Sequence, residues 1–188
     1  MSDKSDFQAN SCFWYYGVLT IILIILGWAC VLIGFPDREP IPGKKKSDLR
    51  WPANLDNWEY SIHSVIPYII WSISLVLFGW GAYHADCRDI PDQVIQIYRS
   101  FFLGIIVLDV LALFLFFILH NVIAALAAHI YSLVLIMGLI MLYSEIDVND
   151  AWFAYPYFLW IIYFIYTTWF ALNMNKNHAQ MRNILFAL

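Results

Sequence analysis

The feature that most constrains this chain is an uncharged run from Ala151 to Asn175, AWFAYPYFLWIIYFIYTTWFALNMN. A helix needs about 20 mainly apolar residues to cross a bilayer, and the run is long enough. Aromatic residues occur along its whole length, whereas spanning helices usually keep Trp and Tyr near the two interfaces. Trp160, Phe164 and Thr167 share one helical face by their spacing. That face predicts either a pocket for a flat apolar ligand or an aromatic seam against a neighbouring helix, and this helix taken alone favours the seam.

Composition places nearly the whole chain in a membrane. Of its residues 62% are hydrophobic and only 13% are charged, whereas a soluble domain has about 25% charged residues. The net charge of −4 and the lack of a basic stripe in the sequence argue against a nucleic-acid partner. Three cysteines are too few for a disulfide framework.

The hydrophobic runs predict an all-α, five-helix membrane bundle that forms a single domain over residues 1–188. The expected spans are 13–35, 60–83, 97–119, 122–143 and 151–174, with a long loop at 36–59 between the first two. Only His120 and Asn121 separate the third span from the fourth, which predicts that these two helices are antiparallel neighbours.

Five spans would place the two termini on opposite sides of the membrane. Three Lys or Arg residues then lie on the side of the N-terminus and seven on the other side. The positive-inside rule therefore predicts that the long loop and the C-terminus face the cytoplasm. The first residues are polar and mixed in charge, unlike a cleaved signal peptide. A mitochondrial membrane is the favoured location, and other membranes remain open.

Asp109 is the single residue that most strongly indicates a functional site, because it lies near the middle of the third span. A charged carboxylate at mid-membrane costs roughly 2.5–3.5 kcal/mol, so intramembrane acids are usually functional or paired. One hypothesis is a functional carboxylate. The other is a neutral acid hydrogen-bonded to a neighbouring helix, for example to a serine of the second span.

Metal and enzyme signals in the sequence are weak. His63, His120 and His129 are expected in the same half of the bundle, but haem ligation needs two imidazoles at matching depth. His84 and Cys87 form an H-x-x-C without a second pair to complete a zinc site. No phosphate loop or catalytic motif is visible in the sequence. We therefore expect no required cofactor, no metal and no catalytic residues, and enzymatic activity stays open.

Three short motifs stand in register in the second half of the chain. They are P-Y-x-x-W with an aromatic residue three positions later, L-D separated by six residues from F-F, and A-L-A. Their residues are Pro156, Tyr157, Trp160 and Tyr163; Leu108, Asp109, Phe116 and Phe117; Ala125, Leu126 and Ala127. With 38 residues between Phe117 and Pro156, the pattern resembles the translocator protein / tryptophan-rich sensory protein (TspO/MBR) family over residues 97–175. Upstream the likeness is weaker and rests on Trp58, Tyr60 and Tyr68.

The chain also departs from the family pattern. Asp109 and Thr168 stand where the family has Asn, and Ala112 and Ala124 stand where it has Trp. A small Ala124 would enlarge the pocket, and an acid at 109 would suit a basic or hydroxylated ligand.

The resemblance implies a five-helix bundle that binds porphyrins such as protoporphyrin IX, sterols or synthetic aromatic ligands, with the first loop as a lid. It implies ligand-binding roles for Trp160, Ala127, Phe164, Thr167 and Asp109, and pocket-shaping roles for Pro156, Tyr157, Phe116, Phe117 and Trp58. The expected function is transport or sensing. The expected partners are the lipid bilayer, a small hydrophobic ligand, and either a second copy of the chain in a homodimer or a larger membrane complex. The alternatives are a structural accessory subunit with a closed pocket and a haem-bearing redox protein.

Overall fold

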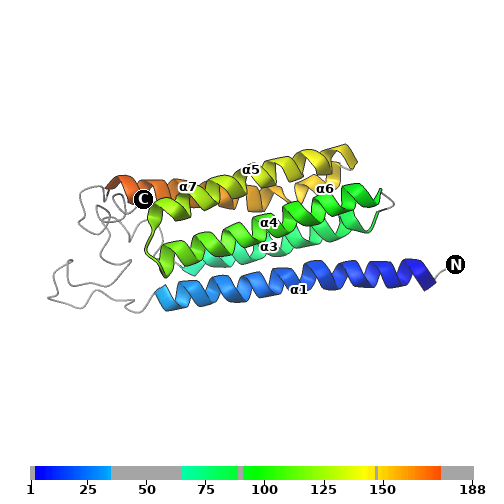
Figure 1. The fold of residues 1–188 in the computed structure, drawn as a ribbon, viewed down its shortest axis with the longest axis horizontal. Helices are drawn as coiled ribbons and strands as arrows, with labels where there is room; N and C mark the ends of the chain where they lie inside the picture. The colour runs from blue at the N-terminus through cyan, green and yellow to red at the C-terminus, as the bar shows by residue number, and fades with distance from the viewer. Residues whose placement is uncertain (1–2, 35–64, 89–90, 147, 175–188) are drawn as a thin grey trace.

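The structure is a computed structural model that describes residues 3–34, 65–88, 91–146 and 148–174, and every element in these ranges is a helix. The helices are α1 (Asp3–Gly34), α3 (Val65–Asp86), α4 (Asp92–Phe117), α5 (Val122–Ile146), α6 (Val148–Trp152) and α7 (Tyr155–Met174). The long helices lie side by side along one axis, and the short α6 lies at one end (Figure 1). The predicted all-α class is confirmed.

Four of the described helices are long and apolar enough to cross a membrane: Trp14–Ile33, Ile66–Asp86, Gln93–Phe117 and Val122–Glu145. Their outer surfaces are apolar too, as the exposed Ile25 and Val107 illustrate. Helices that are apolar all round suit a lipid environment. α7 is uncharged and has 20 residues, but its many Trp and Tyr side chains make it less hydropathic, so a fifth span stays a prediction. The loop predicted at 36–59, Trp58 and His63 lie outside the described residues.

Among the described helices, α4 and α5 pack against each other over the greatest length. A tight turn joins them, and within it His120 adopts a left-handed backbone conformation with φ of 57°. The side-chain oxygen of Asn121 accepts a hydrogen bond from the Ala124 N–H at 3.0 Å, which caps the first turn of α5. The prediction that these two helices are antiparallel neighbours is confirmed (Figure 1).

Helix boundaries differ from the hydrophobic runs mainly where polar residues continue a helix. α4 begins at Asp92 rather than at 97, and α5 continues to Ile146 rather than to 143. α7 begins at Tyr155 rather than at 151, because α6 and a short turn precede it. Pro156 falls in the first turn of α7, where a missing backbone N–H removes no helical hydrogen bond.

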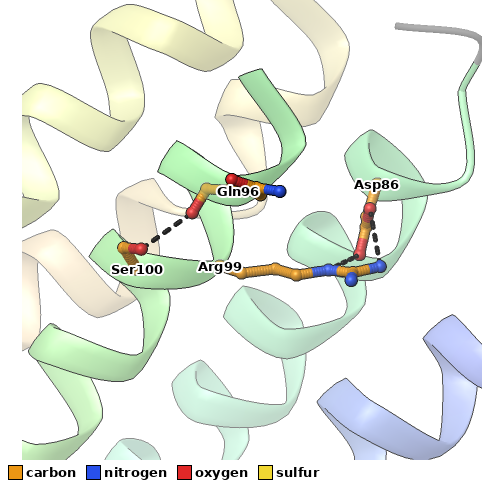
Figure 2. A network of polar contacts seen from close by, with 4 residues as sticks. All are labelled: Asp86, Gln96, Arg99 and Ser100. Carbon is orange, nitrogen blue, oxygen red and sulfur yellow. Dashed lines mark hydrogen bonds and ion pairs between the residues drawn. The ribbon is translucent and has the colours of Figure 1, made fainter. Parts of the chain in front are cut away.

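Ion pairs join the helices at the end of the bundle where α6 lies, and we call this the paired end. The Arg99 guanidinium of α4 donates from Nε and from an Nη to the Asp86 carboxylate of α3, at 3.0 and 3.3 Å (Figure 2). The Asp86 side chain is fully buried, whereas 42% of the Arg99 side chain is exposed. Arg99 also lies over the Tyr15 ring at 5.6 Å, and Arg88 pairs with Asp150 of α6 at 3.0 Å. These contacts fix α1, α3, α4 and α6 to one another.

Candidate functional site

A group of buried aromatic rings from three helices packs together inside the bundle, and we call it the aromatic wall. It consists of Trp160 and Phe164 of α7, Tyr68 of α3 and Phe117 of α4. The Trp160 ring centroid lies 5.7 Å from that of Phe164 and 6.4 Å from that of Tyr68. Tyr68 in turn lies 6.3 Å from Phe117. The inward face of α7 therefore packs as an aromatic seam.

Next to the aromatic wall lies a buried polar centre, formed by Asp109 of α4, Trp71 of α3 and His129 of α5. The Trp71 indole N–H donates a hydrogen bond to Asp109 Oδ2 at 3.0 Å. His129 Nδ1 lies 3.6 Å from Asp109 Oδ1, which is longer than a hydrogen bond. The His129 ring lies 4.5 Å from the Phe164 ring. The polar centre and the aromatic wall are thus in direct contact.

Hydrogen bonding in the polar centre is incomplete. Neither ring nitrogen of His129 has a hydrogen-bond partner among the described residues, although the side chain is buried. Such a group costs about 1–3 kcal/mol when it stays unpaired. When Asp109 and His129 share one ionisable proton, the pair carries no net charge. A neutral pair costs less free energy to place in an apolar medium than a single charged group does.

The partner of Asp109 is a tryptophan rather than a serine. Ser74 of α3 donates its hydroxyl to the Trp71 carbonyl at 2.8 Å, and Ser72 donates to the Tyr68 carbonyl at 2.9 Å. Both hydroxyls bond back to their own helix, as intramembrane serines commonly do. The expectation that a serine of the second span binds Asp109 is therefore wrong for these two serines, and Trp71 takes that place.

A glycine of α1 gives Trp71 room to reach Asp109. A Cβ placed on Gly27 would collide with Cη2 of the Trp71 indole. α1 and α3 can therefore approach closely only because residue 27 has no side chain. The position of the indole, and with it the hydrogen bond to Asp109, depends on this contact.

A groove of about 500 Å³ lies between α3 and α7, and we call it the lateral groove. Six residues line it: Pro67, Ile70, Pro156, Leu159, Trp160 and Tyr163. Its volume falls in the range of about 300–1,000 Å³ that is usual for small-molecule sites. Trp160 is shared by the lateral groove and the aromatic wall, although only 6% of its surface is exposed.

The structure buries most, but not all, of the residues expected to bind or shape a pocket. Phe116, Phe117, Trp160, Phe164, Thr167 and Asp109 are all buried in the bundle. Tyr157, in the first turn of α7, is buried too, and its ring stacks on Phe78 at 4.9 Å. Pro156 lines the lateral groove. Ala127 is exposed on α5 and does not join this group.

Sequence reasoning singled out neither Trp71 nor His129 as a neighbour of Asp109. A polar residue within an apolar run is the signal that could have drawn attention to His129, because such residues tend to pair inside a membrane. Trp71 gave no such signal among so many aromatic residues. His129 faces Asp109 and Phe164, and the described residues contain no group of three or more His, Cys, Asp or Glu arranged for a metal ion.

Four helices able to span a membrane, an apolar outer surface and a buried Asp–His pair define an integral membrane protein built as a helical bundle. The sequence model of the TspO/MBR family matches residues 20–173, and the chain belongs to this family. The match includes the aromatic wall, the polar centre and the lateral groove. Among curated proteins and among solved structures, no significant match was found.

Proposed function

We propose that this protein binds a flat hydrophobic ligand, a porphyrin-type tetrapyrrole or a sterol, at the aromatic wall for transport or sensing. The observation that carries the proposal is the contact between the aromatic wall and the incompletely bonded polar centre. Flat rings gain favourable offset or edge contacts with aromatic side chains. Membership in the TspO/MBR family supports the same general role.

The polar centre indicates what the ligand carries at its edge. His129 offers ring nitrogens without a hydrogen-bond partner among the described residues, and Asp109 offers a carboxylate oxygen that faces His129. A ligand with a hydroxyl or an N–H at one edge would complete these hydrogen bonds. A purely hydrocarbon ligand would leave them unmade and would bind more weakly.

A structural role in a larger membrane complex is the second candidate. The observation that favours it is the filling of the bundle centre by its own side chains, because Tyr68, Phe117 and Phe164 are almost completely buried. A ligand must displace at least one of these rings. A haem-bearing redox role has less support, since His129 lies against Asp109 and Phe164.

The proposal also includes a location and an orientation. The distribution of Lys and Arg favours the long loop and the C-terminus on the cytoplasmic side, and a mitochondrial membrane is the favoured location. Protease protection of tags at the two termini in isolated organelles would test both.

The test of ligand binding is a titration of the detergent-purified protein with protoporphyrin IX. The porphyrin absorbance is followed together with the quenching of tryptophan fluorescence. We expect saturable micromolar binding, and we expect Trp160→Phe to weaken it about tenfold, a loss of about 1.4 kcal/mol. Asp109→Asn tests the polar centre in the same assay.

The matched control is Trp169→Phe, which removes an exposed tryptophan of the same helix. It should leave the affinity unchanged. If the wild-type protein shows no saturable binding to protoporphyrin IX or to a sterol probe, the binding role is wrong and the structural role becomes the better explanation.

A further inference from the structure

The lateral groove opens on the outer flank of the bundle. Leu159 and Ile70 on its rim are 62% and 54% exposed. Pro67 and Pro156 come from the first turns of α3 and α7, and these helices run in opposite directions (Figure 1). The groove is therefore lined by the first turns of two antiparallel helices, and its exposed rim lies on the flank of the bundle.

Two aromatic rings inclined at 42° to each other line the lateral groove and offer edge and face contacts to a ligand ring. Trp160 and Tyr163 lie side by side in the groove with ring centroids 5.3 Å apart. The two prolines contribute compact rings, and their missing N–H groups cost no helical hydrogen bond in a first turn. The groove thus combines an aromatic floor with aliphatic rims, which matches a planar hydrophobic molecule dissolved in lipid.

One side chain, Trp160, lies both in the lateral groove and in the aromatic wall. On the inner side its ring contacts Phe164, and Phe164 contacts His129 of the polar centre. The path from the groove to the polar centre is therefore two aromatic rings thick. Trp160 is the outer of these two rings, so a ligand that enters from the groove must displace Trp160 first and Phe164 after it. Neither ring belongs to the paired end.

We propose that the ligand reaches the polar centre laterally, from the bilayer through the groove between α3 and α7, and that Trp160 is the gate. This inference rests on the proposed binding function. Its ligand is the same flat hydrophobic molecule, which partitions into lipid before it meets the protein. The rival route passes the end of the bundle that carries the first loop.

The test measures rates as well as affinity. Protein in lipid nanodiscs is mixed with vesicles that contain protoporphyrin IX, and the porphyrin fluorescence is followed in time. Leu159→Trp narrows the groove at its rim. We expect association and dissociation to slow together, each by about tenfold, with the equilibrium affinity within about twofold of wild type, because a gate changes rates and not the bound state.

The matched control is Ile162→Trp, since Ile162 is also exposed on α7 but does not line the groove. Its rates should equal those of the wild type. Ile70→Trp narrows the groove from α3 and keeps the test valid if Leu159→Trp fails to fold.

Three outcomes overturn the lateral route. Unchanged rates in both groove variants would place the entrance elsewhere, although the binding function would stand. Weaker equilibrium binding with unchanged association would make the groove itself the final binding site. A wild-type protein that does not bind would overturn the function and the route together.

Discussion

Two buried carboxylates in this bundle have very different surroundings. Asp86 at the paired end receives two hydrogen bonds from the Arg99 guanidinium, whereas Asp109 receives one from the Trp71 indole and faces His129 at 3.6 Å. A buried charge held by a bidentate arginine serves the fold, because its charge and its hydrogen bonds are satisfied. An intramembrane acid beside a buried imidazole that has no hydrogen-bond partner among the described residues is a functional candidate by the same reasoning. The comparison therefore assigns a structural role to the paired end and a ligand-binding role to the polar centre.

The largest expected effect is at the paired end. Arg99→Met keeps the length of the side chain but leaves the Asp86 carboxylate buried without its bidentate partner. Breaking a buried pair in this way costs about 3–5 kcal/mol, and the partial exposure of Arg99 argues for a loss of about 3 kcal/mol in the free energy of unfolding. Unfolding in mixed micelles with increasing SDS measures it.

Ser100→Ala is the matched control on the next residue, because the Ser100 hydroxyl bonds only to the Gln96 carbonyl of its own helix among the described residues (Figure 2). It should change the free energy of unfolding by less than about 0.5 kcal/mol. Ligand affinity should stay unchanged in both variants. An Arg99→Met protein as stable as wild type would remove the structural side of the comparison.

The sequence predicted the long helices and the importance of Asp109, because both depend on local signals. A charge within an apolar run is visible in the sequence, and the inward face of α7 follows from the spacing of Trp160 and Phe164. The short helix α6 was not predicted, since it has only five residues and its Asp150 pairs with a distant Arg88.

The contacts between helices could not be predicted in the same way. α5 is apolar on nearly every side, so its pattern does not say which face turns inward. For that reason the sequence could not show that His129 faces Asp109 or that Ala127 is exposed. The position of Trp71 depends on Gly27 of another helix, which is a tertiary contact without a local signal.

The second prediction concerns the surroundings of Asp109, which depend on Gly27 through Trp71. Gly27→Ala places a methyl group against the Trp71 indole, so the indole must shift and its hydrogen bond to Asp109 must lengthen or break. Overpacking a close contact costs about 1–3 kcal/mol, and we expect a loss of about 2 kcal/mol in the free energy of unfolding. The fluorescence maximum of the tryptophans should shift as well.

Gly17→Ala is the matched control on the same helix, because no atom of the described residues lies within 4 Å of a Cβ placed at Gly17. Its free energy of unfolding should stay within about 1 kcal/mol of wild type, on the stabilised side, since Ala favours helix more than Gly does. Equal losses in both variants would mean that α1 tolerates no added volume anywhere, and Trp71 would then not be a special contact.

The smallest expected effect has the opposite sign, and it bears most directly on the comparison. His129→Leu replaces a buried imidazole that has no hydrogen-bond partner among the described residues by an apolar side chain of similar size. Removing an unpaired polar group should raise the free energy of unfolding by about 1 kcal/mol. Asp109 keeps its hydrogen bond from Trp71 and can remain a neutral acid, so the substitution leaves no unpaired charge.

The same variant should bind protoporphyrin IX more weakly, because it removes a group that the ligand is proposed to meet. His129→Gln is the control, since it keeps a hydrogen-bonding side chain in the same place and should retain more of the affinity. If His129→Leu is more stable but binds the porphyrin more weakly, then His129 destabilises the fold and serves binding. That combination is expected of a ligand-binding site. A loss of more than about 2 kcal/mol in stability would instead make Asp109–His129 a structural pair like Asp86–Arg99. Both buried carboxylates would then serve the fold, and the bundle would have no ligand-binding site at Asp109. The role as a subunit of a larger membrane complex would then be the better explanation.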